Sequence, residues 1–282
     1  MRWSPRSAAF RGDWVPPDTG RWHWDADDYA KHSGAQRAWA MELVAKLGLA
    51  GTEAVLDIGC GDGAVTAELA ARVPAGEVVG IDSSEDMIRK ARLSFPPDRH
   101  PNLSFQLMDA RSLCFEDRFE VAFSNATLHW VRDQAAVLRG TAAALKKGGR
   151  LLFQMGGRGN AADILAVLEE MIPAEPWSRF FDGFEFPYSF SSPEEYREWI
   201  GAAGLSARRI ELIPKHMQQD GREALAGWVR TTWLPWTERV PPSMREAFLA
   251  EIVDRYASSH PADARGCLTV RMVRLEVEAE KP

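Results

Sequence analysis

The chain has 282 residues, 45% of them hydrophobic, and a formal net charge of −6. That size fits one large domain or a core with a smaller partner, and the negative charge argues against a broad nucleic-acid-binding face, which needs clustered cations. The three cysteines, Cys60, Cys114 and Cys267, predict neither a disulfide framework nor a metal site and favour a reducing, cytoplasmic location. We expect no signal peptide, no membrane span and no membrane partner.

The first half of the chain is predicted to alternate strands and helices. Residues 1–28 form an irregular segment, and helical spacing then covers 27–47, with Trp39, Leu43 and Leu47 on one face. Strands are predicted at 53–58, 77–82, 102–107, 118–124 and 149–155, and helices at 63–72, 84–94 and 133–146. Lys146-Lys-Gly-Gly149 is typical of a helix end. The alternation predicts an α/β fold with a parallel sheet and right-handed crossovers.

The second half is predicted to be mainly helical. Helices are expected at 161–172, from Ser192 to Ala203, and over most of 221–260, with breaks at Pro235 and Pro241-Pro242; strands are expected at 206–214 and 266–279. We interpret 156–205 and 215–265 as a helical cap, interrupted by the core strand 206–214, over the carboxyl edge of the sheet, where open α/β sheets bind ligands. The core then comprises 29–155, 206–214 and 266–282.

The motif Asp57-Ile-Gly-Cys-Gly-Asp-Gly63 joins a predicted strand to a predicted helix. Its glycines allow a ligand to approach the backbone closely. A dinucleotide site is the main rival, but the spacing is G-x-G-x-G, and Asp57 and Asp62 would repel a pyrophosphate at the helix N-terminus. The ammonium of S-adenosyl-L-methionine (SAM) would instead be attracted. A tight turn without any ligand is the structural alternative.

Two further acids follow the next two predicted strands. Asp82 is placed to accept hydrogen bonds from ribose hydroxyls, and Met87 could lie on a purine face or simply pack in a helix core. Asp109 could accept the adenine amine, with the Ala110 N–H at a ring nitrogen, or serve as a turn or cap residue. Three acids after three successive strands favour SAM over the structural alternatives.

Four segments resemble the class I SAM-dependent methyltransferases, and most of all their trans-aconitate methyltransferase group: Val55-Leu-Asp-Ile-Gly-Cys-Gly-Asp-Gly63, Gly80-Ile-Asp-Ser-Ser84 with Met87, Asp109-Ala110, and Phe123-Ser-Asn-Ala-Thr-Leu-His-Trp130. The chain is also similar to the juvenile hormone acid and malonyl-acyl-carrier-protein methyltransferases. The resemblance is strong over about 25–155. It implies a Rossmann-like, seven-stranded, mostly parallel sheet with helices on both faces and an antiparallel last strand.

The resemblance also implies roles for individual residues around SAM and its product, S-adenosyl-L-homocysteine (SAH). The turn residues Asp57, Gly59, Cys60 and Gly61 would hold the methionine end, and Asp82 with Ser83 the ribose. The adenine would meet Asp109, Ala110 and Met87, and the backbone of Asn125 would face the sulfonium. Tyr29, Ser33 and Gln36 share one helical face, which either closes over the cofactor or packs in the core.

The resemblance implies that the acceptor is a small molecule and, most of all, a carboxylic acid, whose ionised carboxylate needs no general base. His129 is then either a base or, with Trp130, a residue that shapes the substrate pocket. Cations for a polycarboxylate would come from a set whose members could equally be surface charges: Arg158, Arg230, Arg271 and Arg274. An aromatic set either lines an apolar pocket or packs the cap: Trp177, Phe180, Phe181, Phe184, Phe186 and Tyr188.

The sequence thus predicts a SAM-dependent methyltransferase that forms a methyl ester, without a metal. Three alternatives stay open at this point. The acceptor could be a hydroxyl, an amine or an acyl group on a carrier protein. The chain could bind SAM without catalysis, or it could be a nicotinamide-dependent oxidoreductase, against which the glycine spacing counts. The oligomeric state cannot be read from the sequence.

Overall fold

The computed structural model describes residues 34–282, with only the backbone for residues 34–37. These residues divide into two compact units. The core unit comprises 35–160, 188–214 and 273–282, and the helical unit comprises 161–187 and 215–272 together with Gly34. Strands β6 (Ser206–Gln219) and β7 (Leu268–Glu280) contribute residues to both. The predicted place of the helical segments over the edge of the sheet stays a prediction.

A seven-stranded sheet with the order β3-β2-β1-β4-β5-β7-β6 confirms the predicted α/β fold. Its remaining strands are β1 (Ala54–Ile58), β2 (Glu77–Asp82), β3 (Leu103–Leu107), β4 (Phe119–Asn125) and β5 (Leu145–Gly156). Strands β1 to β5 pair in parallel, and β7 pairs antiparallel with β5, as the resemblance implied. Parallel strands bring their carboxyl ends to one edge of the sheet, and the predicted site residues follow those ends.

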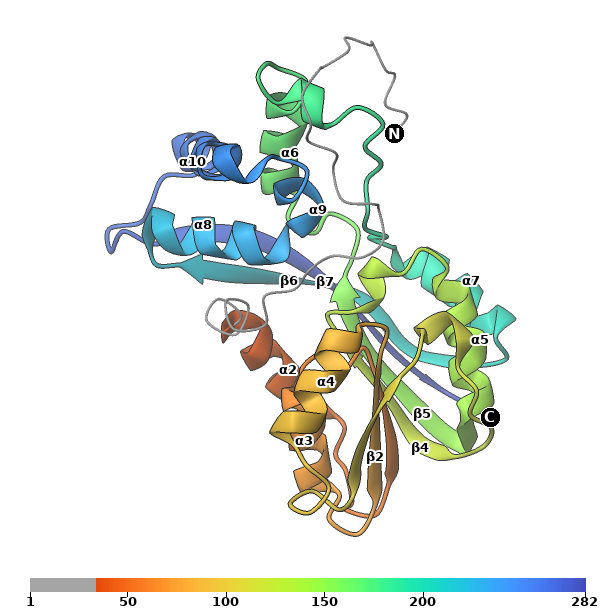
Figure 1. The fold of residues 1–282 in the computed structure, drawn as a ribbon. Coiled ribbons are helices and arrows are strands. Elements are labelled where there is room, and N and C mark those ends of the chain that lie inside the picture. Colours follow the sequence, from red (N-terminus) through yellow and green to blue (C-terminus); the bar gives the residue numbers. More distant parts are fainter. Residues whose placement is uncertain (1–33) are drawn as a thin grey trace. The chain divides into compact units, whose positions relative to one another are not determined.

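Both faces of this sheet are covered by helices, as Figure 1 shows for the core unit. Val55 points to one face and its neighbours Leu56 and Ile58 contribute to the cluster on the other, because side chains alternate along a strand. The first face packs against α2 (Gly34–Lys46), α3 (Ala64–Arg72) and α4 (Glu85–Ser94), and the second against α5 (Gln134–Ala144) and α7 (Pro193–Ala202). Leu43 in α2 and Leu47, directly after it, are buried, as the helical spacing predicted.

Three predicted boundaries are wrong: the helix end at 146, the start at 149 of the strand that is β5, and the end at 214 of the strand that is β6 and runs to Gln219. The helix expected to run to residue 146 ends at Ala144, and Leu145 begins β5 by pairing with Phe119. Leu145 is fully buried, so its burial and its backbone pairing outweigh the helix-ending signal of the two lysines and two glycines that follow. Lys146, the residue after Leu145, forms an ion pair with Glu120.

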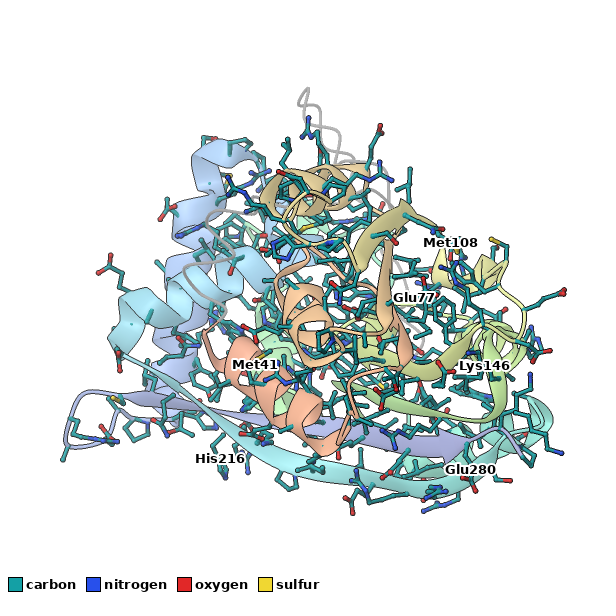
Figure 2. All side chains as sticks on the ribbon, turned by 90° about the horizontal axis from the view of Figure 1, so that it is seen from below. Met41, Glu77, Met108, Lys146, His216 and Glu280 are labelled. Carbon is teal, nitrogen blue, oxygen red and sulfur yellow. The ribbon has the colours of Figure 1, made fainter. Side chains whose placement is uncertain are left out.

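The amino edge of the sheet carries exposed ion pairs. Arg118 forms a two-pronged pair with Glu77, with Nε 3.1 Å from Oε1 and Nη2 2.9 Å from Oε2. Glu77 begins β2 and Lys146 lies near the start of β5; both are labelled in Figure 2. The four side chains of these two pairs have good access to water, so the pairs contribute little to stability.

The helical unit contains α6 (Ala162–Met171), α8 (Gly221–Thr232), α9 (Leu234–Thr237) and α10 (Pro242–Ser259), and α10 packs against α6 and α8. The helix breaks predicted at the prolines are confirmed, since Pro235 lies in the first turn of α9 and Pro242 begins α10. The Trp177 ring packs on Phe248 and its Nε1 donates to Glu251 Oε2 at 2.7 Å. None of the helices described for 34–282 has the length and apolar character needed to cross a membrane.

Candidate functional site

The glycine turn after β1 is fastened to the end of β2. The backbone N–H groups of Gly59 and Cys60 both donate to the Ile81 carbonyl, at 2.8 and 2.9 Å. The next N–H, that of Gly61, donates to Asp82 Oδ2 at 3.0 Å, while Asp82 Oδ1 accepts from Ser84 N at 2.8 Å. Asp82 therefore holds the turn in place with one oxygen and starts α4 with the other. Its remaining lone pairs suit ribose hydroxyls.

The first two glycines of the turn are required for different reasons. Gly59 has φ +79°, and a Cβ there would lie 2.1 Å from Thr127 Cγ2, so a side chain is excluded by a neighbouring strand end. Gly61 has φ +54°, but a Cβ there would meet nothing within 4 Å. The open space above Gly61 leaves its backbone accessible, as close contact with a ligand requires.

Asp57 lies near the end of β1, two residues before Gly59, and is only 2% exposed. Its Oδ2 accepts a hydrogen bond from Thr66 Oγ1 at 2.7 Å. The pKa of Asp57 is raised to about 7, mainly by burial; the Thr66 hydrogen bond opposes this rise, and the nearby charge of Asp82 adds to it. Burial also raises the pKa of Asp82. Two poorly hydrated carboxylates below an open glycine backbone fit the ammonium and ribose of SAM and would repel a phosphate.

The predicted adenine end is built by a short 3-10 helix, η1 (Ala110–Ser112). Asp109 caps it by accepting from Arg111 N at 2.8 Å. The Arg111 guanidinium also grips the carboxylate, with Nη2 2.6 Å from Oδ2, and this pairing lowers the pKa of Asp109. Sequence reasoning missed Arg111, although a cation two residues after a capping acid is a usable signal. Met87 is buried in α4, whereas Ser83 is exposed.

His129 lies at the carboxyl edge, in the 3-10 turn η2 (Leu128–Trp130) just after β4. Its Nδ1 accepts from the backbone N–H of Gly156 at 3.3 Å, and its carbonyl accepts from Ser189 N at 2.7 Å. Burial, and then the positive charge of Arg274, lower the pKa of His129 to about 3. At neutral pH the ring is therefore uncharged, and because Nδ1 accepts, its proton is on Nε2.

Aromatic rings surround this imidazole. Trp130, Tyr188 and Phe190 have ring centroids 5.9, 5.6 and 5.9 Å from that of His129. Tyr188 also meets Trp130 edge to face at 4.6 Å and stacks on Phe190 at 5.2 Å. Of these rings, only Phe190 was missed by the sequence. Tyr188 was predicted as a member of the aromatic set. It belongs to the core unit, whereas the other members of that set, from Trp177 to Phe186, belong to the helical unit.

The predicted cations differ in their surroundings. Arg274 is 5% exposed, and its guanidinium carbon lies 4.7 Å above the Trp39 ring. It faces Gly156 in the β5–β7 register, beside His129. Arg271 is exposed and forms a fork with Asp163, with Nε 2.7 Å from Oδ2. Arg158 is exposed and lies 3.4 Å from Glu195, and Arg230 is exposed on α8.

The remaining predicted cofactor residues are Asn125, Cys60, Tyr29, Ser33 and Gln36. Asn125 ends β4 opposite Gln154 of β5, beside the glycine turn. Cys60 is buried, and burial raises the pKa of its thiol well above the usual value, so the thiol stays protonated. Tyr29 and Ser33 lie outside the described residues, as does the side chain of Gln36. Within 34–282 no group of three His, Cys, Asp or Glu side chains is arranged to hold a metal ion.

Comparison with known proteins agrees with this geometry. Residues 55–149 match the family model of a methyltransferase domain. The chain is 30% identical to the trans-aconitate 2-methyltransferase of Methylobacterium nodulans over 92% of its own length and 98% of that protein, and 30% identical to that of Agrobacterium fabrum over 92% and 99%. The YcgJ protein of Bacillus subtilis shares the fold, with a TM-score of 0.60 and 19% identity over 87% of this chain and 98% of that one. The chain therefore belongs to the class I SAM-dependent methyltransferases, within their trans-aconitate methyltransferase-like group.

Proposed function

We propose that this SAM-dependent methyltransferase acts on the carboxylate of a small organic acid and forms its methyl ester. The observation that carries the proposal is the buried Arg274 beside a neutral His129, where β4 and β5 end. A buried guanidinium beside an imidazole N–H is a donor set for a carboxylate. An amine acceptor would instead need a group able to take up a proton.

The chemistry divides between the cofactor and the chain. When bound, SAM supplies a methyl group that its sulfonium has already activated for displacement. Arg274 binds the acceptor carboxylate, and the Nε2–H of His129 orients one of its oxygens. With a pKa of about 3, His129 is a poor base at neutral pH, but an ionised carboxylate brings no proton to remove. Tyr188 and the rings around it keep water away from the reacting oxygen.

Two kinds of acid fit this proposal. The names of the relatives point to trans-aconitate, a tricarboxylate. The rings of Trp130, Tyr188 and Phe190 instead favour an acid with a flat, apolar body beside its carboxylate. The described core unit presents a single deeply buried arginine at this position, Arg274, which can bind one carboxylate in a bidentate manner.

A product-based screen tests the reaction class. Purified protein with labelled SAM would be offered trans-aconitate, a conjugated monocarboxylate such as cinnamate, a phenol and a primary amine. The expected product is a methyl ester, identified by mass and by release of methanol in alkali. Transfer only to the phenol or the amine would overturn the proposal. SAH binding without transfer to any acid would indicate a SAM-binding module.

Arginine variants test the residue assignment. Arg274→Met is expected to raise the KM for the acid at least tenfold and to leave the Kd for SAH within about twofold, since the lost charge binds the acceptor. Arg274→Lys keeps the charge and should recover part of the loss. Arg118→Met, at the opposite edge of the sheet, is the matched control. An unchanged KM in the Arg274→Met protein, with normal SAH binding, would show that the carboxylate binds elsewhere.

A further inference from the structure

Two hydroxyl side chains join the end of β4 to the end of β1. Ser124 is fully buried, and its Oγ donates to the Ile58 carbonyl at 2.7 Å. Thr127, three residues later, donates from Oγ1 to the next carbonyl along the chain, that of Gly59 just after β1, at 3.1 Å. The two bonds are alike in donor and acceptor type and act on successive carbonyl groups. The two hydrogen bonds differ in the position of the carbonyl that accepts them, because Ile58 is the last residue of β1 and Gly59 begins the glycine turn.

Thr127 makes a second contact that Ser124 lacks. Its Oγ1 also lies 3.1 Å from the Asn125 carbonyl oxygen, so one hydroxyl faces two carbonyl groups. A hydroxyl has a single proton and can share it between two acceptors only if both are held close together. One of these carbonyls belongs to the glycine turn and the other to the strand end opposite it.

Gly59 and Thr127 also fit each other sterically. A Cβ on Gly59 would come within 2.1 Å of Thr127 Cγ2 and 2.3 Å of Oγ1. The methyl group of Thr127 therefore occupies the space that the missing side chain leaves. The neighbouring Ala126 adopts φ +56° and donates its N–H to the Gln154 carbonyl at 2.7 Å, which fixes the backbone that carries Thr127.

We propose that Thr127 is a positioning residue for the cofactor: its hydroxyl sets the separation and orientation of the Gly59 and Asn125 carbonyl groups on the two sides of the methionine end of SAM. Each carbonyl oxygen keeps a lone pair for a second donor. The ammonium of the cofactor is such a donor, and a fixed pair of acceptors binds it with less ordering than a flexible pair. This inference does not depend on which acceptor is methylated.

The test compares Thr127→Val with Ser124→Ala by calorimetric titration with SAH, at a temperature well below both melting points. Thr127→Val keeps the shape of the side chain and removes the hydroxyl. We expect the affinity for SAH to fall about tenfold, which corresponds to the loss of roughly one hydrogen bond. Thr127→Ser should stay within about threefold of the unchanged protein. Ser124→Ala should lower the melting temperature at least as much as Thr127→Val while SAH affinity changes less than twofold.

Two results would overturn the proposal. One is unchanged SAH affinity in Thr127→Val, which would mean that the hydroxyl does not position the carbonyls. The other is an equal loss of SAH affinity in Ser124→Ala, which would mean that both hydroxyls only stabilise the pairing of β4 with β1. If Thr127→Val does not fold, the smaller Thr127→Ala replaces it, with the same tenfold loss expected. The methyl-transfer assay is not needed, so failure here is separate from failure of the proposed carboxylate chemistry.

Discussion

The two edges of the core sheet treat charge in opposite ways. At the amino edge, Glu77 and Glu120 lie in exposed pairs with Arg118 and Lys146. At the carboxyl edge, burial raises the pKa of both Asp57 and Asp82, and the charge of Asp82 adds to the rise at Asp57. At the amino edge, water and a partner of opposite charge both stabilise each charged side chain, so removing one of them changes the free energy of unfolding little. Poor hydration makes charge at the second edge costly, and a cationic ligand removes that cost.

The largest expected effect comes from adding one methyl group at the carboxyl edge. Gly59→Ala combines a left-handed backbone with a 2.1 Å overlap on Thr127, so we expect SAH binding to be lost and unfolding free energy to fall by about 3 kcal/mol or more. Gly148→Ala is the matched control near the amino edge, where φ is +76° and nothing lies within 4 Å. It should cost only about 1 kcal/mol, from the backbone alone. Equal losses in the two variants, by calorimetry and denaturation, would contradict the comparison.

The second effect is a pH dependence of cofactor affinity. Burial raises the pKa of Asp57 to about 7, so ionising it as pH rises destabilises the ligand-free protein, and a bound ammonium removes that penalty. Affinity for SAH should therefore fall about tenfold between pH 8 and pH 6, with proton release on binding. Titrations in two buffers of different ionisation enthalpy measure that release. Asp57→Asn should bind more weakly at pH 8 and lose most of the pH dependence; an equally steep profile in this variant would assign the proton to another group.

A smaller effect concerns His129 and stability. Its pKa in the folded protein, about 3, lies below that of an unfolded histidine, near 6.5. The unfolded chain therefore binds the proton first, and this contribution to stability is present above pH 6.5 and is lost as pH falls. Between pH 7 and pH 5.5 the unchanged protein should lose about 1 kcal/mol more than His129→Phe, measured by urea unfolding. Parallel losses in both proteins would mean that the imidazole is not held neutral.

The smallest effect is expected at the amino edge. Arg118→Met breaks the exposed fork to Glu77 and should change unfolding free energy by less than about 1 kcal/mol, with SAH affinity unaltered. The difference from the unchanged protein should shrink further in 1 M salt, because salt screens exposed charges. A larger loss, or any loss of SAH affinity, would mean that the two edges are coupled and that the contrast between them is too simple.

The residues that we assign to the cofactor could be brought to one edge of the sheet from the sequence, because their signals are local. Asp57 precedes the glycine turn by two residues, and Asp82 and Asp109 each follow a strand that the sequence shows clearly. Strand ends meet at one edge in any parallel sheet, so three separate positions could be gathered without a structure. The wrong helix end at 146 arose where a local signal and a tertiary one disagreed, and the burial of Leu145 against β4 prevailed.

The acceptor half could not be resolved in this way. Arg271 and Arg274 are three residues apart on one strand, yet Arg271 is exposed and paired with Asp163, whereas Arg274 is buried above Trp39. Thr127 was not singled out within the segment 123–130, because its role depends on Gly59, 68 residues earlier. Phe190 joins His129 only through the fold.

The sequence alone determined the fold class, the strand that ends in each carboxylate and the identity of the methyl donor, because these follow from alternation, spacing and the sign of charge. Tertiary structure decided which groups those carboxylates are buried against, which arginine loses its water and which ring nitrogen of His129 carries the proton. These properties depend on strand register and on packing between distant segments, since pairing β4 with β1 and β7 with β5 brings a threonine to a glycine and an arginine to a histidine.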